Sequence, residues 1–273
     1  MAAREQIMSD LGRFPSLGEL LEAFFAPPGA PEEVRKDCQE AWKAHCYNQD
    51  FPIYECWTSD YIDALARYLL ECRQRYASDY ADGKPLRVLE AGAGTGKLTF
   101  GLRQALTGWQ KGCGDEHCGI VIEAVDNSER PMKRLFPDVV READYREALR
   151  ETDYTIVLCA WMPFGADWTS DFRSKASVKE YILIGHTGDG LNGDPLRTWG
   201  YRKLSYEDES EDDDQDDEQV EGYIEESERA YVKDGFERVD LPHLSKWQLC
   251  RFDNVSSLSG QTGSSRTTSF RRK

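Results

Sequence analysis

Short strand-like runs alternate with longer amphipathic stretches through the middle of the chain. The runs, which have the length of buried strands, occupy residues 87–89, 120–125, 139–143, 154–160 and 180–186. Between the first two runs, Leu98, Leu102 and Leu106 recur at the spacing of a helix that packs on a sheet. Strands that alternate with helices predict an α/β fold with a parallel sheet.

The residues before this region have a helical pattern instead. Ser16 and Glu19 have the spacing of a capping box, and Pro31 suits a first helical turn. An apolar stripe at helical spacing begins at Tyr61. We therefore expect residues 1–83 to form a helical extension that covers the functional site.

The C-terminal part of the chain predicts the closing strands of the sheet and a tail. Residues 236–241 and 246–252 alternate polar and apolar positions, as an antiparallel pair does. We expect the α/β domain to span residues 84–255. Residues 256–273 are rich in Ser, Thr and Gly with a few basic residues, which predicts a disordered, weakly basic tail.

The net charge of −16 is concentrated in one segment, because residues 207–218 hold ten carboxylates in twelve positions. Such a run cannot build a packed core, so we expect residues 205–221 to be a disordered insertion. The insertion recruits a basic protein substrate, or repels nucleic acid, or is a solvated loop with no further role.

The composition also indicates the cellular location of the protein and whether it binds a metal ion. The chain has no apolar run of membrane-spanning length, and its first ten residues lack a signal-peptide core. We therefore expect an intracellular protein, cytoplasmic or nuclear, whose eight cysteines are free thiols and which has no membrane partner. Cys113, His117 and Cys118 have the spacing of half a metal site, but a second pair is absent, so a solvent loop is preferred and no metal is expected.

A glycine-rich turn follows the first strand. Gly92, Gly94 and Gly96 lie two positions apart after Glu90, and a helix follows them. Glycine there permits a positive φ and lets a ligand approach the backbone at the helix N-terminus. A triphosphate loop would need a hydroxyl residue in place of Leu98, and a dinucleotide loop would need its third glycine three positions after the second. The spacing argues against both.

This E-x-G-x-G-x-G pattern resembles motif I of the class I S-adenosylmethionine (SAM)-dependent methyltransferases, with no narrower family indicated. The resemblance covers roughly residues 85–253 as an order of elements. It implies SAM as the cofactor and a doubly wound seven-stranded sheet, mostly parallel with the last strand antiparallel. In that family the glycine turn lies against the methionine and ribose of SAM, and the acid at the Glu90 position holds the methionine amine.

Acids also end the next two strands. Asp126 precedes Asn127, and Asp144 precedes Tyr145. The resemblance implies that Asp126, beside Asn127, accepts hydrogen bonds from the ribose hydroxyls, and that Asp144 binds the adenine amino group with Tyr145 beside the ring. Each acid has an alternative role as the N-cap of a following helix.

The fourth strand leads to the expected acceptor side of the site. Cys159 and Ala160 end this strand next to the cofactor, and Trp161 and Phe164 follow them. Nucleic-acid amino methyltransferases carry N/D-P-P-F/Y here, and the missing amide argues against a nucleic-acid acceptor. Aromatic faces at this position suit a cationic or planar acceptor, with core packing as the alternative.

Four more side chains complete the candidate site. Asp167 is the nearest carboxylate that could orient or deprotonate an amine. His186 ends the fifth strand and is either a base or an ordinary polar loop residue. Tyr54 and Trp57 occur where the family often places aromatic lid residues, or they pack between helices.

The sequence therefore predicts an enzyme that transfers a methyl group from SAM to a nitrogen or oxygen of a small molecule or of a basic protein side chain. SAM carries its own activation as a sulfonium, so no catalytic triad is expected. The alternative is a catalytically degenerate SAM-binding module that regulates a partner through the acidic insertion.

Overall fold

The computed structural model describes residues 2–79, 84–113, 119–129, 133–186, 192–200, 226–255 and 263–273. Within them, one sheet has the strand order β3-β2-β1-β4-β5-β7-β6. The strands are β1 (Leu86–Ala91), β2 (Ile120–Asp126), β3 (Val140–Glu142), β4 (Ile156–Ala160), β5 (Glu180–His186), β6 (Phe236–Asp240) and β7 (Ser265–Arg272). The α-helices are α1 (Ala2–Ser9), α2 (Leu17–Phe24), α3 (Glu32–Cys46), α4 (Ser59–Arg75), α5 (Lys97–Cys113), α6 (Tyr145–Glu151), α7 (Thr169–Ser174), α8 (Ala230–Lys233) and α9 (Pro242–Ser245). The 3₁₀ turns are η1 (Ala77–Asp79), η2 (Pro137–Val139) and η3 (Glu226–Glu228).

The first five strands run parallel, and β7 lies antiparallel between β5 and β6. β1 pairs with β2 on one side and with β4 on the other, so the direction of winding reverses at β1. The carboxyl ends of β1, β2, β4 and β5 therefore meet at one edge of the sheet. This arrangement confirms the predicted α/β fold with a doubly wound seven-stranded sheet.

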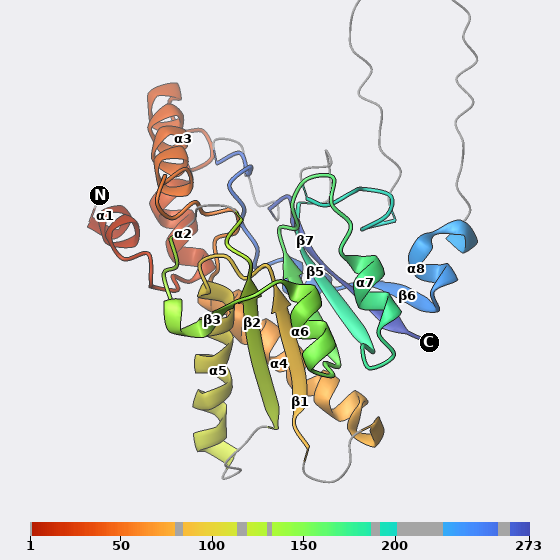
Figure 1. Cartoon of the computed structure of the whole chain (residues 1–273). Helices are drawn as coiled ribbons and strands as arrows, with labels where there is room; N and C mark the ends of the chain where they lie inside the picture. Colours follow the sequence, from red (N-terminus) through yellow and green to blue (C-terminus); the bar gives the residue numbers. More distant parts are fainter. Residues whose placement is uncertain are drawn as a thin grey trace, which may run out of the picture.

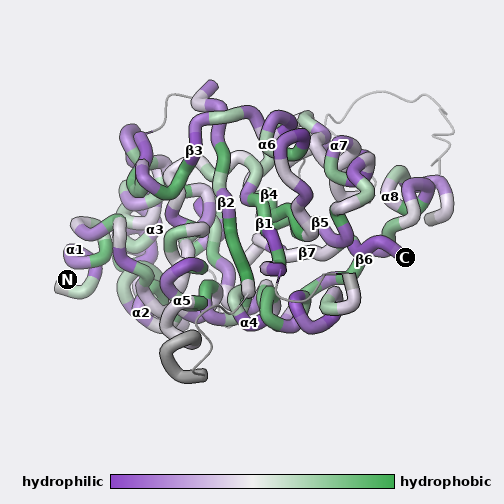
Figure 2. Tube along the Cα trace, turned by 60° about the horizontal axis from the view of Figure 1, so that its bottom comes forward, coloured by the Kyte–Doolittle hydropathy of each residue, from purple (hydrophilic) through white to green (hydrophobic). Residues whose placement is uncertain are grey.

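Alternate residues of the central strands supply two cores. Leu86 and Val88 of β1 pack with α4 and α5, whereas Leu89 and Ala91 pack with α6 and α7. Figure 1 shows these two helix pairs on opposite faces of the sheet, and Figure 2 shows hydrophobic stretches along the central strands. Burial on both faces explains why the strands are continuous apolar runs.

The helices α1, α2 and α3 form a third core around Leu20, Phe24 and Trp42. The predicted capping box is confirmed, since Ser16 and Glu19 exchange hydrogen bonds at the start of α2. These helices gather at the end of the sheet where β1 and β2 finish (Figure 1). The division of the chain into an extension, 1–83, and a domain, 84–255, stays a prediction.

The expectation of a disordered tail is wrong for its second half, because β7 is a strand of the sheet. Phe270 is fully buried and stacks on Tyr181 of β5, with ring centroids 4.6 Å apart. The hydroxyl residues of β7 are buried too, since β7 pairs with strands on both sides. The polar residues that predicted a solvent-exposed tail therefore lie inside the sheet. Residues 256–262 are outside the described residues.

β7 also takes the place that the sequence assigned to residues 246–252. These residues form turns after α9, with a single bridge between Cys250 and Glu55. Trp247 packs against the core that contains α4, and Leu249, which is 2% exposed, packs against the N-terminal helices. The partner of β6 is therefore β7.

Some expectations concern residues that the structure does not describe. The acidic insertion, 205–221, lies entirely among them, and so do His117 and Cys118. In the described part of the chain, no group of His, Cys, Asp and Glu side chains is arranged to hold a metal ion. No described helix is long and apolar enough to span a membrane.

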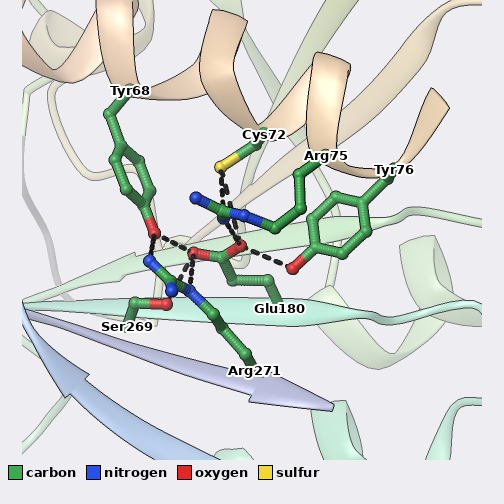
Figure 3. A network of polar contacts seen from close by, with 7 residues as sticks. All are labelled: Tyr68, Cys72, Arg75, Tyr76, Glu180, Ser269 and Arg271. Atoms are coloured by element: carbon green, nitrogen blue, oxygen red, sulfur yellow. Dashed lines mark hydrogen bonds and ion pairs between the residues drawn. The ribbon is translucent and has the colours of Figure 1, made fainter. Parts of the chain in front are cut away.

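A buried carboxylate connects α4 to the sheet at the end opposite the glycine turn. Glu180, the first residue of β5, is fully buried. Its carboxyl oxygens accept hydrogen bonds from Tyr76 at 2.8 Å and Arg75 at 3.1 Å. The other residues around it in Figure 3 are Tyr68, Cys72, Ser269 and Arg271. Two arginines thus balance one carboxylate, and helix, β5 and β7 are held together.

We expect Glu180→Gln to lower the free energy of unfolding by about 3 kcal/mol, because it leaves buried donors and two arginines without their anion. Urea denaturation measures the change. Glu71→Gln, an exposed position on the same helix, is the matched control and should change the value by less than about 0.5 kcal/mol. Equal unfolding midpoints for the two variants would contradict the proposed structural role.

Candidate cofactor and acceptor site

A cavity opens at the carboxyl edge of the sheet, next to the N-terminal helices. Its walls come from residues 7–20, from residues 51–57, from the glycine turn and from the ends of β2 and β4. The point where the winding reverses, between β1 and β4, lies in this cavity. Ligands bind at this point in open α/β sheets.

The glycine turn has the backbone that its sequence predicts. Gly92, Gly94 and Gly96 have φ values of 73°, 52° and 78°, which favour glycine. A Cβ at Gly92 would lie 2.9 Å from Trp168, and one at Gly96 would lie 2.7 Å from Val140. Gly92 and Gly94 line the cavity, whereas Gly96 packs against β3. Two of the three predicted glycines are therefore placed to meet a ligand.

Glu90 lies at the floor of the cavity. It is 2% exposed, and its carboxyl accepts hydrogen bonds from the backbone N–H of Thr99, at 3.1 Å, and from the Thr99 hydroxyl. Burial raises the pKa of Glu90 to about 7. Among the described residues, no lysine or arginine forms an ion pair with it. A buried carboxylate that faces a cavity and has no ion-pair partner suits a cationic ligand group.

Asp126 and Asn127 also line the cavity, at the end of β2. Asp126 Oδ2 accepts a hydrogen bond from Gly94 N, and Oδ1 accepts one from Ser128 N, both at 2.9 Å. Residues 127–129 are not helical, so Asp126 does not have the capping role that was its alternative. The carboxylate instead fixes the glycine turn while one of its sides faces the cavity.

Asp144 has the alternative role that the sequence left open. It is the N-cap of α6, and its side chain accepts a hydrogen bond from Arg146 N at 2.7 Å. Neither Asp144 nor Tyr145 lines the cavity. Tyr145 stacks on Trp168, which does line it, with ring centroids 4.7 Å apart. The adenine role of Asp144 and Tyr145 stays a prediction.

Trp161 lines the cavity in an unusual backbone conformation. It follows β4 directly, and its φ of 55° is unusual for a residue other than glycine. Its indole Nε1 donates a hydrogen bond to Glu55 at 3.0 Å, and its ring lies 5.6 Å from that of Tyr54. Ala160 lines the cavity as well, whereas Cys159 is buried in the strand outside the lining.

The structure separates the remaining candidates. Tyr54 and Trp57 line the cavity, but Phe164 lies outside the lining and is 73% exposed. Asp167 is also outside it and accepts hydrogen bonds from the N–H and hydroxyl of Thr169, at 3.0 and 2.5 Å. His186 ends β5, where its ring lies 6.1 Å from that of Phe252, and does not line the cavity. The two candidate catalytic residues are therefore not brought to the cavity.

Several ionisable residues that line the cavity are not among the predicted candidates, and two of them, Glu55 and Lys97, have shifted pKa values. Glu55 is 4% exposed, and burial raises its pKa to about 8. Lys97 donates a hydrogen bond to Leu11 O at 2.7 Å, and burial lowers its pKa to about 8. The only sequence signal for Glu55 was an acid between aromatic residues. Lys97 directly follows Gly96, as the lysine of a triphosphate loop follows its last glycine, and this is its only sequence signal.

We expect Glu90→Gln to become more stable relative to the parent protein as the pH rises from about 4.5 to about 7, with a constant difference above that range. The folded state favours the protonated carboxyl, so this stabilisation is complete below the ordinary pKa and is lost as the pH rises through the raised pKa. Urea denaturation at a series of pH values, without ligand, measures the difference. A difference independent of pH over this range would contradict the raised pKa.

Comparisons with known proteins concern the fold. No family model and no curated protein matches the chain. Among solved structures, DszA carbon methyltransferase is 16% identical, with 77% of this chain and 53% of that chain covered and a TM-score of 0.41. A SAM-dependent methyltransferase from Archaeoglobus fulgidus is 20% identical, with coverages of 45% and 54% and a TM-score of 0.26. Magnesium protoporphyrin IX methyltransferase from Synechocystis is 10% identical, with coverages of 99% and 98% and a TM-score of 0.33.

The chain spans about half the length of the first two of these structures. With identities of 20% or less and TM-scores below 0.5, these similarities establish neither the fold nor the reaction. The strand order is independent of them, with five parallel strands that wind in both directions from β1 and an antiparallel β7. With this order and its glycine turn, the chain has the fold of the class I SAM-dependent methyltransferases.

Proposed function

We propose that the chain binds SAM and transfers its methyl group to a nitrogen or oxygen atom of a small molecule or of a basic protein side chain. The observation that carries this proposal is that Glu90, the glycine turn and Asp126 line the same cavity at the winding reversal. Each is a side chain or backbone group that suits one part of SAM.

The residues that line this part of the cavity fit SAM in their charges as well as in their positions. Glu90 would hold the methionine ammonium, since it is buried, faces the cavity and forms no ion pair among the described residues. Asp126 would hold the ribose hydroxyls, because a carboxylate accepts hydrogen bonds from both. Glycines at 92 and 94 let the ligand approach the backbone. When bound, SAM supplies a methyl group that its sulfonium already activates.

The contribution of the chain is then to exclude water and to orient the acceptor. The N-terminal residues 7–20 close one side of the cavity, and Lys97 ties them to the start of α5 through Leu11. Tyr54, Trp57 and Trp161 give aromatic walls on the other side. These walls favour an acceptor with a planar or cationic group.

We expect Asp126→Ala to weaken SAM binding by about 1 to 3 kcal/mol through the loss of charge-assisted hydrogen bonds. Isothermal titration calorimetry measures the affinity, and thermal unfolding checks that the variant folds. Asp138→Ala is the matched control, because Asp138 is exposed in η2 and does not line the cavity. This variant should bind SAM with the affinity of the parent protein. Unchanged affinity in Asp126→Ala would show that the ribose assignment is wrong.

The reaction itself is tested with SAM labelled in its methyl group. We expect the purified protein to transfer label to one size fraction of a cell extract, and the size class of the product then separates a small molecule from a protein. Glu90→Gln should reduce both SAM binding and transfer. Clear SAM binding without transfer to any fraction would favour the regulatory module over the enzyme.

A further inference from the structure

We infer that Glu55 holds the amino group of the methyl acceptor, so that the acceptor is an amine. This inference rests on the proposed function and narrows its acceptor from nitrogen or oxygen to an amine nitrogen. It rests on the position of Glu55 along the sheet edge, on the charge of its surroundings and on the aromatic walls beside it.

Glu55 lies beside the cofactor half of the cavity. Its Oε2 accepts hydrogen bonds from the indole of Trp161, at 3.0 Å, and from the hydroxyl of Ser265, at 2.6 Å. Trp161 follows β4, which pairs directly with β1, the strand that carries Glu90. Neighbouring strands lie about 4.8 Å apart. Ser265 is the first residue of β7, which follows β4 and β5 in the strand order. A group bound at Glu55 therefore lies on the side of the glycine turn away from β2 and Asp126, towards the ends of β4 and β7.

The surroundings of Glu55 leave its charge unbalanced. Its third partner is Gln248, whose Nε2 donates to Oε1 at 3.3 Å, so all three partners are neutral donors. An ionised carboxylate has about four acceptor sites, so these three donors leave one site open. Among the described residues, none forms an ion pair with Glu55. The titratable groups that act on it or respond to its charge are Cys56, Tyr61, Cys250 and Asp253.

None of these four groups is a cation, and an ionised Asp253 adds negative charge. An ammonium in the cavity would supply the missing positive charge. A neutral alcohol or a carboxylate would not. The charge therefore selects an amine among the nitrogen and oxygen acceptors.

Aromatic side chains next to Glu55 favour the same class of ligand. The rings of Tyr54 and Trp161 lie 5.6 Å apart, and both line the cavity. An ammonium near such faces gains cation–π attraction in addition to its ion pair. The nearby cation Arg251 lies over the rings of Tyr47 and Tyr54, at 3.8 and 4.5 Å. The contact with Tyr54 shows that one ring of this wall accepts a cation.

Glu55 also has the chemistry to prepare the acceptor. An ammonium has no lone pair, so one proton must leave its nitrogen before that nitrogen can bond to carbon. The Glu55 carboxylate takes this proton on an oxygen, the N–H electron pair becomes the lone pair of the neutral amine, and the carboxylate becomes a carboxylic acid. Burial raises the pKa of Glu55 to about 8, closer to the pKa of an amine than an ordinary carboxylate is.

The experiment uses three probes of matched shape: 2-phenylethylamine, 2-phenylethanol and 3-phenylpropionate. Their affinities for the full-length protein are measured by calorimetry at pH 9, with and without SAM. We expect the amine to bind at least tenfold more tightly than the alcohol or the acid. In Glu55→Gln this preference should fall below twofold, while Glu71→Gln, an exposed control, retains it.

The pH dependence gives a second readout. Amine binding to the parent protein should increase as the pH rises through about 8, where Glu55 ionises, and decrease near pH 10, where the amine loses its charge. The increase near pH 8 should be absent in Glu55→Gln. Glu55→Asp keeps the charge and should retain part of the amine preference, which keeps the test valid if Glu55→Gln folds poorly.

The outcomes separate this inference from the proposed function. Equal binding of amine and alcohol to the parent protein, or an amine preference that survives in Glu55→Gln, would overturn the role of Glu55. If SAM still binds in that case, the proposed function stands. Failure of SAM itself to bind the parent protein would overturn the proposed function.

Discussion

The common direction of β1, β2, β4 and β5 is the constraint on which the site depends. Because these strands are parallel neighbours, each of them delivers the residue that follows it to the same edge of the sheet. Helices cover both faces, so this edge is where the loops lie open to ligands. Residues far apart in the sequence, such as Glu90, Asp126 and Trp161, therefore share one cavity.

The parts of this arrangement that the sequence predicted are those whose signal is local. A strand buried on both faces is a continuous apolar run, and the glycine turn needs three residues at fixed spacing. β7 has no such signal, since its buried Thr267 and Ser269 are polar. Their hydroxyls donate to Gln248 at 2.7 Å and to Glu180 at 2.5 Å, which lie elsewhere in the chain. Only the folded chain shows that these hydroxyls have buried partners.

The same limit applies to the buried glutamates of the site and of the sheet. Glu180 and Glu55 are equally inconspicuous in the sequence, and both are buried. Glu180 lies between Arg75 and Arg271, outside the cavity, where its charge is balanced. Glu55 lies in the cavity among neutral donors. The difference between a structural and a ligand-binding carboxylate is therefore the charge of its neighbours, which come from distant parts of the chain.

Trp161 shows how these distant parts control the acceptor side. A residue other than glycine at positive φ costs about 1 to 3 kcal/mol, so its surroundings must hold it there. The backbone N–H of Trp161 donates to Ile184 O of β5 at 2.9 Å, and its indole donates to Glu55. Glu55 is in turn held by Ser265, the first residue of β7. The orientation of Trp161 thus depends on the C-terminal strand. A substitution in β7 would therefore change the acceptor side of the cavity and leave the contacts of Glu90 and Asp126 unchanged.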